Sequence, residues 1–395
     1  MEGVGSARGA SSFLDGLRVL DLTRLLPGGV ASWLLTSMGA DVVKVEEPTT
    51  GDYLRGMPPL GPRGNLYFEH LHRSQRSLAV DLKDPRGREV LMALAWRADV
   101  LLEGFRPGVM NRLGLGFDEL AGANPGLIYC SLTAFGQGPG PRQTAAHDLN
   151  ILGLSGLLAY LTDGAGRTLP PPIQLADVAG GGLLAVVAVL GALVARGRTG
   201  RGCHLDVAML DGLRIIGVLQ RAEGAGSGRY PGPDGLPLAG NLACYNVYST
   251  ADGGTMALGA LEPKFWAAFC AGVERPAWVD RQFGPSAQQR AMTAEVAAVF
   301  AARTRTEWEG FAALHDCCLT PVVPLAEAVG GPMAAGRPPD DGFPVAVRGG
   351  SDPAGPVLGP RPAPALGRDT AAILQDLGIS AANIRAWAQA GVIRT

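Results

Sequence analysis

Three residues in this chain of 395 could together move a proton off and back onto carbon: His147, Asp177 and Glu262. A histidine exchanges protons near neutral pH, and a facing carboxylic acid can act as its partner in acid–base chemistry. Two such groups on opposite sides of a carbon can remove a proton from one face and return one to the other. This chemistry inverts a stereocentre, and it requires no metal, flavin or nicotinamide.

The elements that must position these residues follow an alternating pattern over the first two hundred residues. Helices are expected over 27–38, after the pair Asp84-Pro85, and over the apolar stretch that follows Asp177. Short apolar strands alternating with helices predict an α/β fold with a parallel sheet covered on both faces. The expected strands are 17–22, 41–46, 77–82, 99–103, 127–132 and 203–207.

A change in composition divides the chain. Residues 224–240 are rich in Gly and Pro and are expected to form a linker. Beyond them, a hairpin over 243–259 and helices over 263–273 and 291–302 predict a small α+β domain at 241–330. We therefore expect a large Rossmann-like domain over 1–223. Residues 331–395 are expected to form a linker and a C-terminal segment that returns to the large domain.

Composition narrows the class of protein. The chain has 34 basic and 36 acidic residues, which argues against a nucleic-acid partner and a polybasic membrane segment. Its six cysteines lack metal-ligand spacing and fit a reducing compartment, so we expect a cytoplasmic protein without a metal. Residues 178–195 are uncharged and near the length of a membrane span. Because nothing else in the sequence indicates a bilayer, we favour a buried helix over a membrane segment.

Several motifs together give the chain a resemblance to family III CoA-transferases (CaiB/BaiF-like proteins), and within them to α-methylacyl-CoA racemases. The resemblance runs from about residue 14 to about residue 324. The matching segments are Leu17-Arg18-Val19-Leu20-Asp21-Leu22, Gly39-Ala40-Asp41-Val42-Val43-Lys44-Val45-Glu46, Asp81-Leu82-Lys83, Glu103-Gly104-Phe105-Arg106-Pro107-Gly108-Val109, Arg112-Leu113-Gly114-Leu115-Gly116 and Thr199-Gly200-Arg201-Gly202.

The resemblance implies an interlocked-ring homodimer that acts on an acyl-CoA substrate, with each active site between two subunits. Racemases of the family have a His, an Asp 30 residues later and a Glu in an E-P-x-F turn. His147, Asp177 (177 − 147 = 30) and Glu262 fit these positions. The transferases use an aspartate nucleophile, whose place corresponds to Asp148. We therefore expect a racemase with no cofactor beyond the CoA moiety of its substrate.

In this interpretation His147 and Asp177 stand on opposite faces of a planar enolate, and Glu262 holds the imidazole in one tautomer. Backbone N–H groups near Asp148 or Asp177 could meet the thioester oxygen. The apolar residues after Asp177 should raise its pKa, although a helix start favours the anion. Without the resemblance, Asp177 would be an ordinary helix N-cap and Glu262 the opening residue of a helix.

Basic residues near strand ends are the candidates for binding the CoA phosphates. They are Lys83, Arg106, Arg112 and, less directly, Arg76, while the resemblance adds Val80, Leu82, Gly104, Leu113 and Gly114 as lining of the nucleotide groove. One departure from the family concerns the same groove: the basic residue expected after the second strand is Glu47.

Two alternatives stay open. The first is a CoA-transferase that forms an acyl anhydride and then an enzyme–CoA thioester on Asp148. The second is a non-catalytic acyl-CoA-binding protein. The sequence does not specify the acyl group, and sterol side chains, branched fatty acids, polyketide intermediates and 2-arylpropionyl groups all remain candidates.

Overall fold

The computed structural model describes residues 13–140, 143–163, 165–331 and 361–395. With those gaps, one compact unit comprises residues 13–158, 170–216 and 361–395, and a second comprises residues 159–169 and 217–331. The expected domain boundary at residue 223 falls inside α9 (Val218–Ser227), which belongs to the second unit. Residues 332–360 of the expected linker lie outside the described residues.

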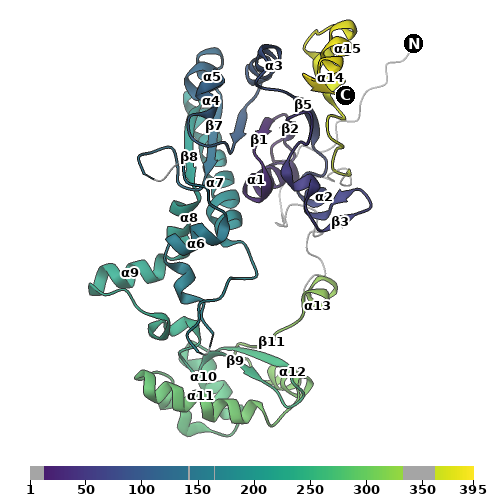
Figure 1. Ribbon diagram of the computed structural model, residues 1–395. Coiled ribbons are helices and arrows are strands. Elements are labelled where there is room, and N and C mark those ends of the chain that lie inside the picture. The colour runs from purple at the N-terminus through teal and green to yellow at the C-terminus, as the bar shows by residue number, and fades with distance from the viewer. Residues whose placement is uncertain (1–12, 141–142, 164, 332–360) are drawn as a thin grey trace. The chain divides into compact units, whose positions relative to one another are not determined.

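The sheet of the first unit has seven strands in the order β12-β5-β2-β1-β6-β7-β8 (Figure 1). All neighbouring strands are parallel except β12, which pairs antiparallel with β5 at the edge. From β1 the chain builds β2 and β5 on one side, and then β6, β7 and β8 on the other. The strands are β1 (Arg18–Leu22), β2 (Asp41–Glu46), β5 (Arg76–Val80), β6 (Val100–Glu103), β7 (Ile128–Thr133), β8 (Cys203–Ala208) and β12 (Ile393–Arg394).

This strand order has a topological switch point between β1 and β6. In open α/β sheets, ligands bind in the crevice outside the carboxyl ends of the strands at such a point. The segments that leave β1 and β6 there are Thr23-Arg24 and Gly104-Phe105. The parallel α/β architecture expected from the sequence is confirmed, and its ligand-binding edge is defined by these two segments.

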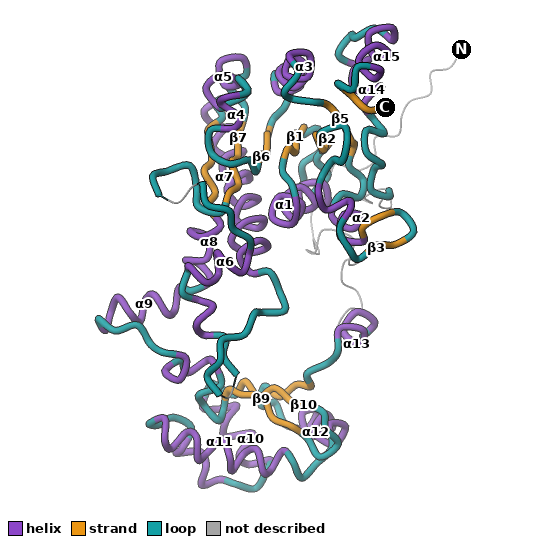
Figure 2. The backbone as a smooth tube through the Cα atoms, viewed as in Figure 1, coloured by secondary structure: helices purple, strands orange, loops and turns teal. Residues whose placement is uncertain are grey.

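Side chains along each central strand alternate between two hydrophobic cores, one on each face of the sheet. Val19 packs in the core that includes α1 and α7, whereas Leu20 packs in the core that includes α3, α14 and α15. Helices therefore cover both faces (Figure 2). The helices of this unit are α1 (Leu25–Ser37), α2 (Leu66–Leu71), α3 (Pro85–Ala95), α4 (Val109–Arg112), α5 (Phe117–Ala123), α6 (Asp148–Leu154), α7 (Leu184–Thr199), α8 (Met209–Ile216), α14 (Thr370–Asp376) and α15 (Ala381–Gln389).

The apolar stretch after Asp177 is a continuous helix of two kinds. A π-helical segment, η3 (Ala176–Leu183), packs against α1 and α8, and α7 continues from it along β7 and β8. Among the described residues, Ala176–Thr199 is the helix whose length and composition would allow a membrane span. One face of this helix packs on the sheet, whereas Val187 and Val194 on it are each 64% exposed, so it is only partly the buried helix expected from the sequence. One such stretch is weak evidence for a membrane segment.

The second unit has its own antiparallel sheet, with the strand order β11-β10-β9, and its own core. Trp266, Phe300 and Trp308 are fully buried there, and the ring centroids of Phe300 and Trp308 lie 4.4 Å apart. The hairpin of β9 and β10 is the one expected from the sequence. The elements are β9 (Tyr245–Ser249), β10 (Thr255–Gly259), β11 (Leu319–Pro321), α9, α10 (Pro263–Gly272), α11 (Ser286–Phe300), α12 (Arg305–Leu314) and α13 (Leu325–Gly330).

Candidate active site

A cavity of about 480 Å³ opens at the carboxyl edge of the large sheet, at the switch point between β1 and β6. Segments that follow β1, β6 and β7 form its walls, among them Thr23-Arg24, Gly104-Phe105 and Thr133-Ala134. His147 and Asp177 both line this cavity. The structure therefore brings together the two residues that the sequence singled out as a pair of bases. We call this space the reaction cavity.

His147 is the residue that begins α6. Its backbone is extended (φ −116°, ψ 176°), and its N–H donates to the Asn150 side-chain oxygen at 3.1 Å. Its carbonyl accepts the N–H groups of Asn150 and Ile151, the first bonds of the helix. These contacts hold the backbone of His147 while its side chain stays exposed. The imidazole is therefore accessible to a ligand in the reaction cavity.

Asp177 lies inside the first turn of the π-helix. Helical bonding has already begun before it, because the Val178 N–H donates to the Gln174 carbonyl at 3.0 Å. The interpretation of Asp177 as an N-cap is therefore wrong. π-Helical turns are rare and frequently occur at functional sites. Here the segment carries a partly buried carboxylate into the cavity wall.

The buried carboxylate of Asp148 accepts the backbone N–H of Asp177 at 2.9 Å. It thereby satisfies a donor at the start of the π-helix and fixes the start of α6 to the backbone that carries Asp177. The walls of the reaction cavity include His147 and Asp177, whereas the Asp148 carboxylate is turned to this N–H. The position predicted for a transferase nucleophile therefore has a capping role in this structure.

Charge and burial set the protonation of Asp177. Burial and the neighbouring Asp148 carboxylate raise the pKa of Asp177 to about 6, against the opposing effect of His147. This is the direction expected from the apolar sequence after Asp177. At neutral pH both protonation states of Asp177 are accessible, as a residue that alternates between acid and base requires.

The run Gly180-Gly181-Gly182 allows the π-helix to pack closely on its neighbours. A Cβ atom on Gly180 would lie 2.7 Å from the Met209 carbonyl oxygen, and one on Gly182 would lie 2.7 Å from Val30 Cβ. Both distances are below ordinary contact distance. The glycines therefore place the segment that carries Asp177 directly against α1 and α8.

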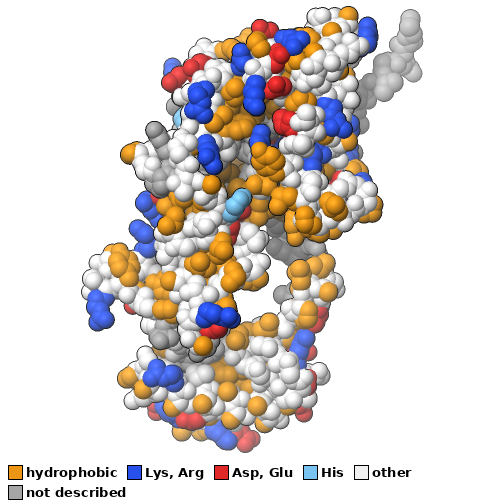
Figure 3. All heavy atoms as spheres, in the orientation of Figure 1, with side chains coloured by type: hydrophobic (Ala, Val, Ile, Leu, Met, Phe, Trp, Pro, Cys, Tyr) orange, Lys and Arg blue, Asp and Glu red, His pale blue; other side chains and the backbone are white. Residues whose placement is uncertain are grey.

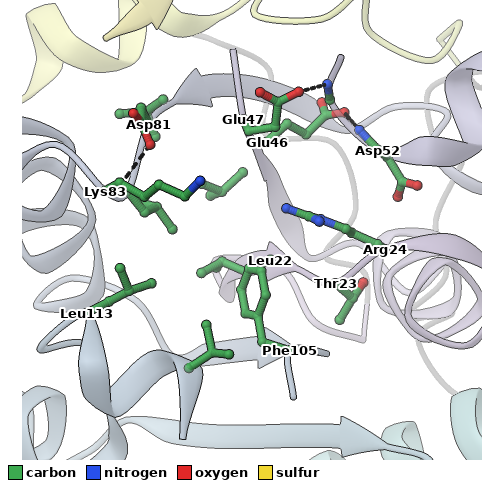
Figure 4. A pocket seen from close by; sticks show the side chains of 15 residues that line it. Leu22, Thr23, Arg24, Glu46, Glu47, Asp52, Asp81, Lys83, Phe105 and Leu113 are labelled. Carbon is green, nitrogen blue, oxygen red and sulfur yellow. Dashed lines mark hydrogen bonds between the residues drawn. The ribbon is translucent and has the colours of Figure 1, made fainter. Parts of the chain in front are cut away.

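A second cavity lies beside the first, at the carboxyl ends of β1, β2 and β5 (Figure 4). We call it the nucleotide groove, because it is lined by Val80, Leu82 and Leu113, as the resemblance implied, and by Lys83, a predicted phosphate ligand. Its volume is about 170 Å³, and Thr23, Arg24 and Phe105 line both it and the reaction cavity. Gly104 lines the reaction cavity, and Gly114 (φ 69°) forms the turn after α4.

Arg106 and Arg112 line a third, more polar cavity of about 530 Å³, and Arg106 also borders the reaction cavity. Behind them, Ser131 and the ring of His204 lie in hydrogen-bond contact (2.9 Å). Burial raises the pKa of Glu103, which lies beside Ser131 in the sheet. Two of the predicted phosphate ligands therefore lie together, next to the reaction cavity.

Arg76 is separated from the other predicted ligands. It begins β5, whereas Lys83 follows the end of that strand, and its guanidinium pairs with Asp41 at 2.6 Å where β2 begins. The side chains of this pair are partly exposed, Arg76 to 36% and Asp41 to 48%. The structure thus places Arg76 at the amino-terminal edge of the sheet, away from the edge that forms the cavities.

Glu262 belongs to the second unit. It precedes Pro263 at the start of α10, with extended backbone (φ −74°, ψ 140°) and an exposed side chain. The side chain makes no cap hydrogen bond to the helix. Its predicted role, which is to hold the imidazole of His147, stays a prediction.

A buried ionic cluster supports the wall that the two cavities share, and the sequence did not reveal it. Lys44 Nζ lies 3.2 Å from a carboxylate oxygen of Asp21 and 3.2 Å from one of Asp52, and it donates to the Thr23 carbonyl at 2.6 Å. Asp52 also accepts the N–H of Leu25, whose φ is 62°. The cluster therefore fixes the loop that carries Arg24. Its members are far apart in sequence, so only the fold reveals their contact.

Residues 14–337 match CoA-transferase family III. The chain is 38% identical to α-methylacyl-CoA racemase from Mus musculus, over 80% of this chain and 79% of that protein. It is 36% identical to a probable fatty acyl-CoA transferase from Mycobacterium tuberculosis, over 75% of this chain and 78% of that protein. The crystal structure of a CaiB/BaiF family protein from Brucella suis has a TM-score of 0.78 at 29% identity and covers 93% of this chain and 100% of that one. The chain therefore belongs to CoA-transferase family III, and it is an enzyme of the kind that acts on acyl-CoA thioesters.

Proposed function

We propose that this protein inverts the α-carbon of 2-methylacyl-CoA thioesters by two-base proton transfer. The observation that carries the proposal is the presence of His147 and Asp177 in one cavity, with the pKa of Asp177 raised to about 6. The likeness to the racemase from Mus musculus supports the same reaction.

In the proposed reaction, one of the two side chains takes the α-proton, and the electron pair of the C–H bond moves into an enolate. The negative charge collects on the thioester oxygen, which backbone N–H groups at the start of α6 would meet. The second side chain, protonated beforehand, then gives its proton to the opposite face of the carbon. The product is the opposite enantiomer, and the two side chains have exchanged protonation states.

Proton exchange in heavy water tests this function. The wild-type protein should place deuterium on the α-carbon of at least one member of a panel of branched acyl-CoA thioesters, without any free acid. His147→Ala and Asp177→Ala should each lower the rate by about a hundredfold or more, because proton transfer contributes on this scale. A wild-type protein that exchanges no α-proton in any panel member would exclude the racemase.

The second candidate is a CoA-transferase, which the likeness to a probable fatty acyl-CoA transferase supports. The predicted nucleophile of this alternative is Asp148, of which Oδ1 accepts the Asp177 N–H. The Asp148 carboxylate would attack the thioester carbonyl, release CoA as the thiolate and form an acyl anhydride. Transfer of labelled CoA to an acceptor acid, lost in Asp148→Ala, would identify this activity.

We also propose a homodimer whose active site includes Glu262 of the second subunit. Large apolar side chains are exposed along the long helix, including Val187 and Val194, each 64% exposed. Figure 3 shows apolar side chains among polar ones on the face that it draws. Exposed apolar surface, where it gathers into a patch, is typical of protein–protein interfaces. A dimer mass in light scattering would support the proposal, and a monomer at micromolar concentration would exclude it.

A further inference from the structure

The nucleotide groove contains two cationic side chains that come from different strands. Arg24 follows the end of β1 and Lys83 follows the end of β5. In Figure 4 the guanidinium of Arg24 and the ammonium of Lys83 point toward one another across the groove. An anionic group between them would be attracted by both charges.

Arg24 is held in place by neutral aromatic neighbours. Its Nη1 donates to the Tyr53 hydroxyl at 2.8 Å, and its Cζ lies 4.9 Å from the Tyr53 ring centroid and 5.4 Å from that of Phe105. Among the described residues no carboxylate forms an ion pair with Arg24 or with Lys83. The Tyr53 contact uses one of the five guanidinium donors, so others can bind a phosphate.

Glu47 follows β2, at the position where the resemblance led us to expect a basic residue. Its carboxylate accepts the backbone N–H groups of Thr49 (3.0 Å) and Gly51 (2.8 Å). Although partial burial opposes ionisation, hydrogen bonds from Thr49 and Thr50 lower the pKa of Glu47 to about 2. Glu47 is therefore an anion in the wall of the groove, and it repels a phosphate there.

We propose that Arg24, opposite Lys83, binds a phosphate of the CoA nucleotide and takes the place of the basic residue that position 47 lacks. This inference rests on the proposed function only in that the ligand is a CoA thioester. Arg24 also borders the reaction cavity, so a phosphate bound to it anchors the nucleotide, and the pantetheine arm can extend from there toward His147 and Asp177. The phosphate is either part of the diphosphate or the 3′-phosphate of the ribose, and both have the same recognition chemistry.

The test is calorimetric binding of free CoA and of dephospho-CoA, which lacks the 3′-phosphate. Arg24→Ala should raise the Kd for CoA by about tenfold or more, because charge-assisted hydrogen bonds to phosphate are lost. If Arg24→Ala weakens the binding of both ligands equally, the diphosphate is the group that Arg24 binds. If the variant weakens the binding of CoA alone, Arg24 binds the 3′-phosphate. Glu47→Gln keeps an acceptor for the loop but removes the charge, and it should tighten CoA binding.

Arg18→Ala is the matched control, since Arg18 is exposed at the opposite end of the same strand. It should leave the Kd unchanged. If Arg24→Ala fails to fold, Arg24→Gln keeps most of the side-chain length and should give the same loss. An unchanged Kd in a folded Arg24 variant would overturn the inference even if the wild type racemises its substrate. Conversely, Arg24-dependent CoA binding without α-proton exchange would leave the inference standing and exclude the racemase.

Discussion

The carboxylate of Asp148 accepts the backbone N–H of Asp177 at 2.9 Å, and this hydrogen bond joins the starts of two helices that carry the candidate bases. His147 precedes Asp148 directly, so one buried side chain sets the separation of both proton-transfer groups. The same carboxylate also raises the pKa of Asp177 through its charge. Asp148 thus affects both the geometry and the protonation of the site.

Asp148→Asn tests the electrostatic part of this role. The amide oxygen can still accept the N–H, but the negative charge is gone, so the pKa of Asp177 should fall from about 6 toward its ordinary value. The limb of the pH–rate profile on which Asp177 must be ionised should then move to lower pH, as measured by α-proton exchange between pH 4.5 and 8. A profile that coincides with that of the wild type would contradict this coupling.

Asp177→Asn should stabilise the protein at neutral pH while it abolishes exchange. The pKa is about 6 in the folded protein and about 4 in the unfolded chain, so the folded state binds more protons between these values. Stability of the wild type therefore falls as pH rises from about 4 to about 6, whereas that of the variant does not, because Asn does not ionise. The free energy of unfolding of the variant should exceed that of the wild type by about 1–2 kcal/mol at pH 7.5 and by little near pH 4. A gain in thermal unfolding that does not depend on pH would argue against the shifted pKa.

Gly182→Ala should damage the site through packing. The new Cβ would lie 2.7 Å from Val30 Cβ, which forces the π-helix away from α1 and should cost about 1–3 kcal/mol of stability. Exchange should fall as Asp177 shifts. Gly191→Ala, farther along the same helix with no atom within 4 Å of its new Cβ, should instead be neutral or stabilising. Equal effects of the two substitutions on chemical unfolding would refute the packing argument.

Lys44→Met should be strongly destabilising, because Asp21 and Asp52 would keep buried charges without their cation. Loss of one member of a buried ion pair costs about 3–5 kcal/mol. Lys83→Met, at an exposed lysine, should change the free energy of unfolding by no more than about 0.5 kcal/mol. Denaturant titration of both variants measures the difference, and a tolerated Lys44→Met would show that the cluster does not hold the loop of Arg24.

Co-expression tests the placement of Glu262. His147→Ala and Glu262→Ala subunits carrying different tags can be purified as a mixed dimer. If Glu262 acts on His147 of the other subunit, one of the two sites in this dimer has both residues, and about half of the wild-type activity should return. A mixed dimer no more active than the two parental variants would place Glu262 in the same subunit as its His147, or outside the site.

Much of the fold follows from local pattern. Strands such as Asp41–Glu46 are short apolar runs bounded by glycine and proline, and their alternation with helices implies a parallel sheet. β12 was not predicted, because two residues carry no periodic signal and the strand exists only by pairing with β5. Within the expected C-terminal segment, Gly378, whose φ is 83°, separates α14 from α15.

The site was predictable where a residue type and its spacing carried the signal, as for His147 and Asp177. The π-helix around Asp177 was not, because its geometry depends on close contact with α1 and α8. Arg24 could have been found by the rule that selected Arg106, since each follows a strand that borders the switch point. The same rule argues against Arg76, which begins its strand, β5. The role of Asp148 depends on a hydrogen bond across 29 residues, which no local pattern reveals.

The most direct test of the central claim, two bases on opposite faces of one carbon, uses a single enantiomer of a 2-methylacyl-CoA in heavy water. At low conversion the product enantiomer should carry one deuterium at the α-carbon, while the recovered substrate keeps its proton. Deuterium that enters substrate and product equally from the first turnover would indicate one base acting on both enantiomers and would contradict the claim.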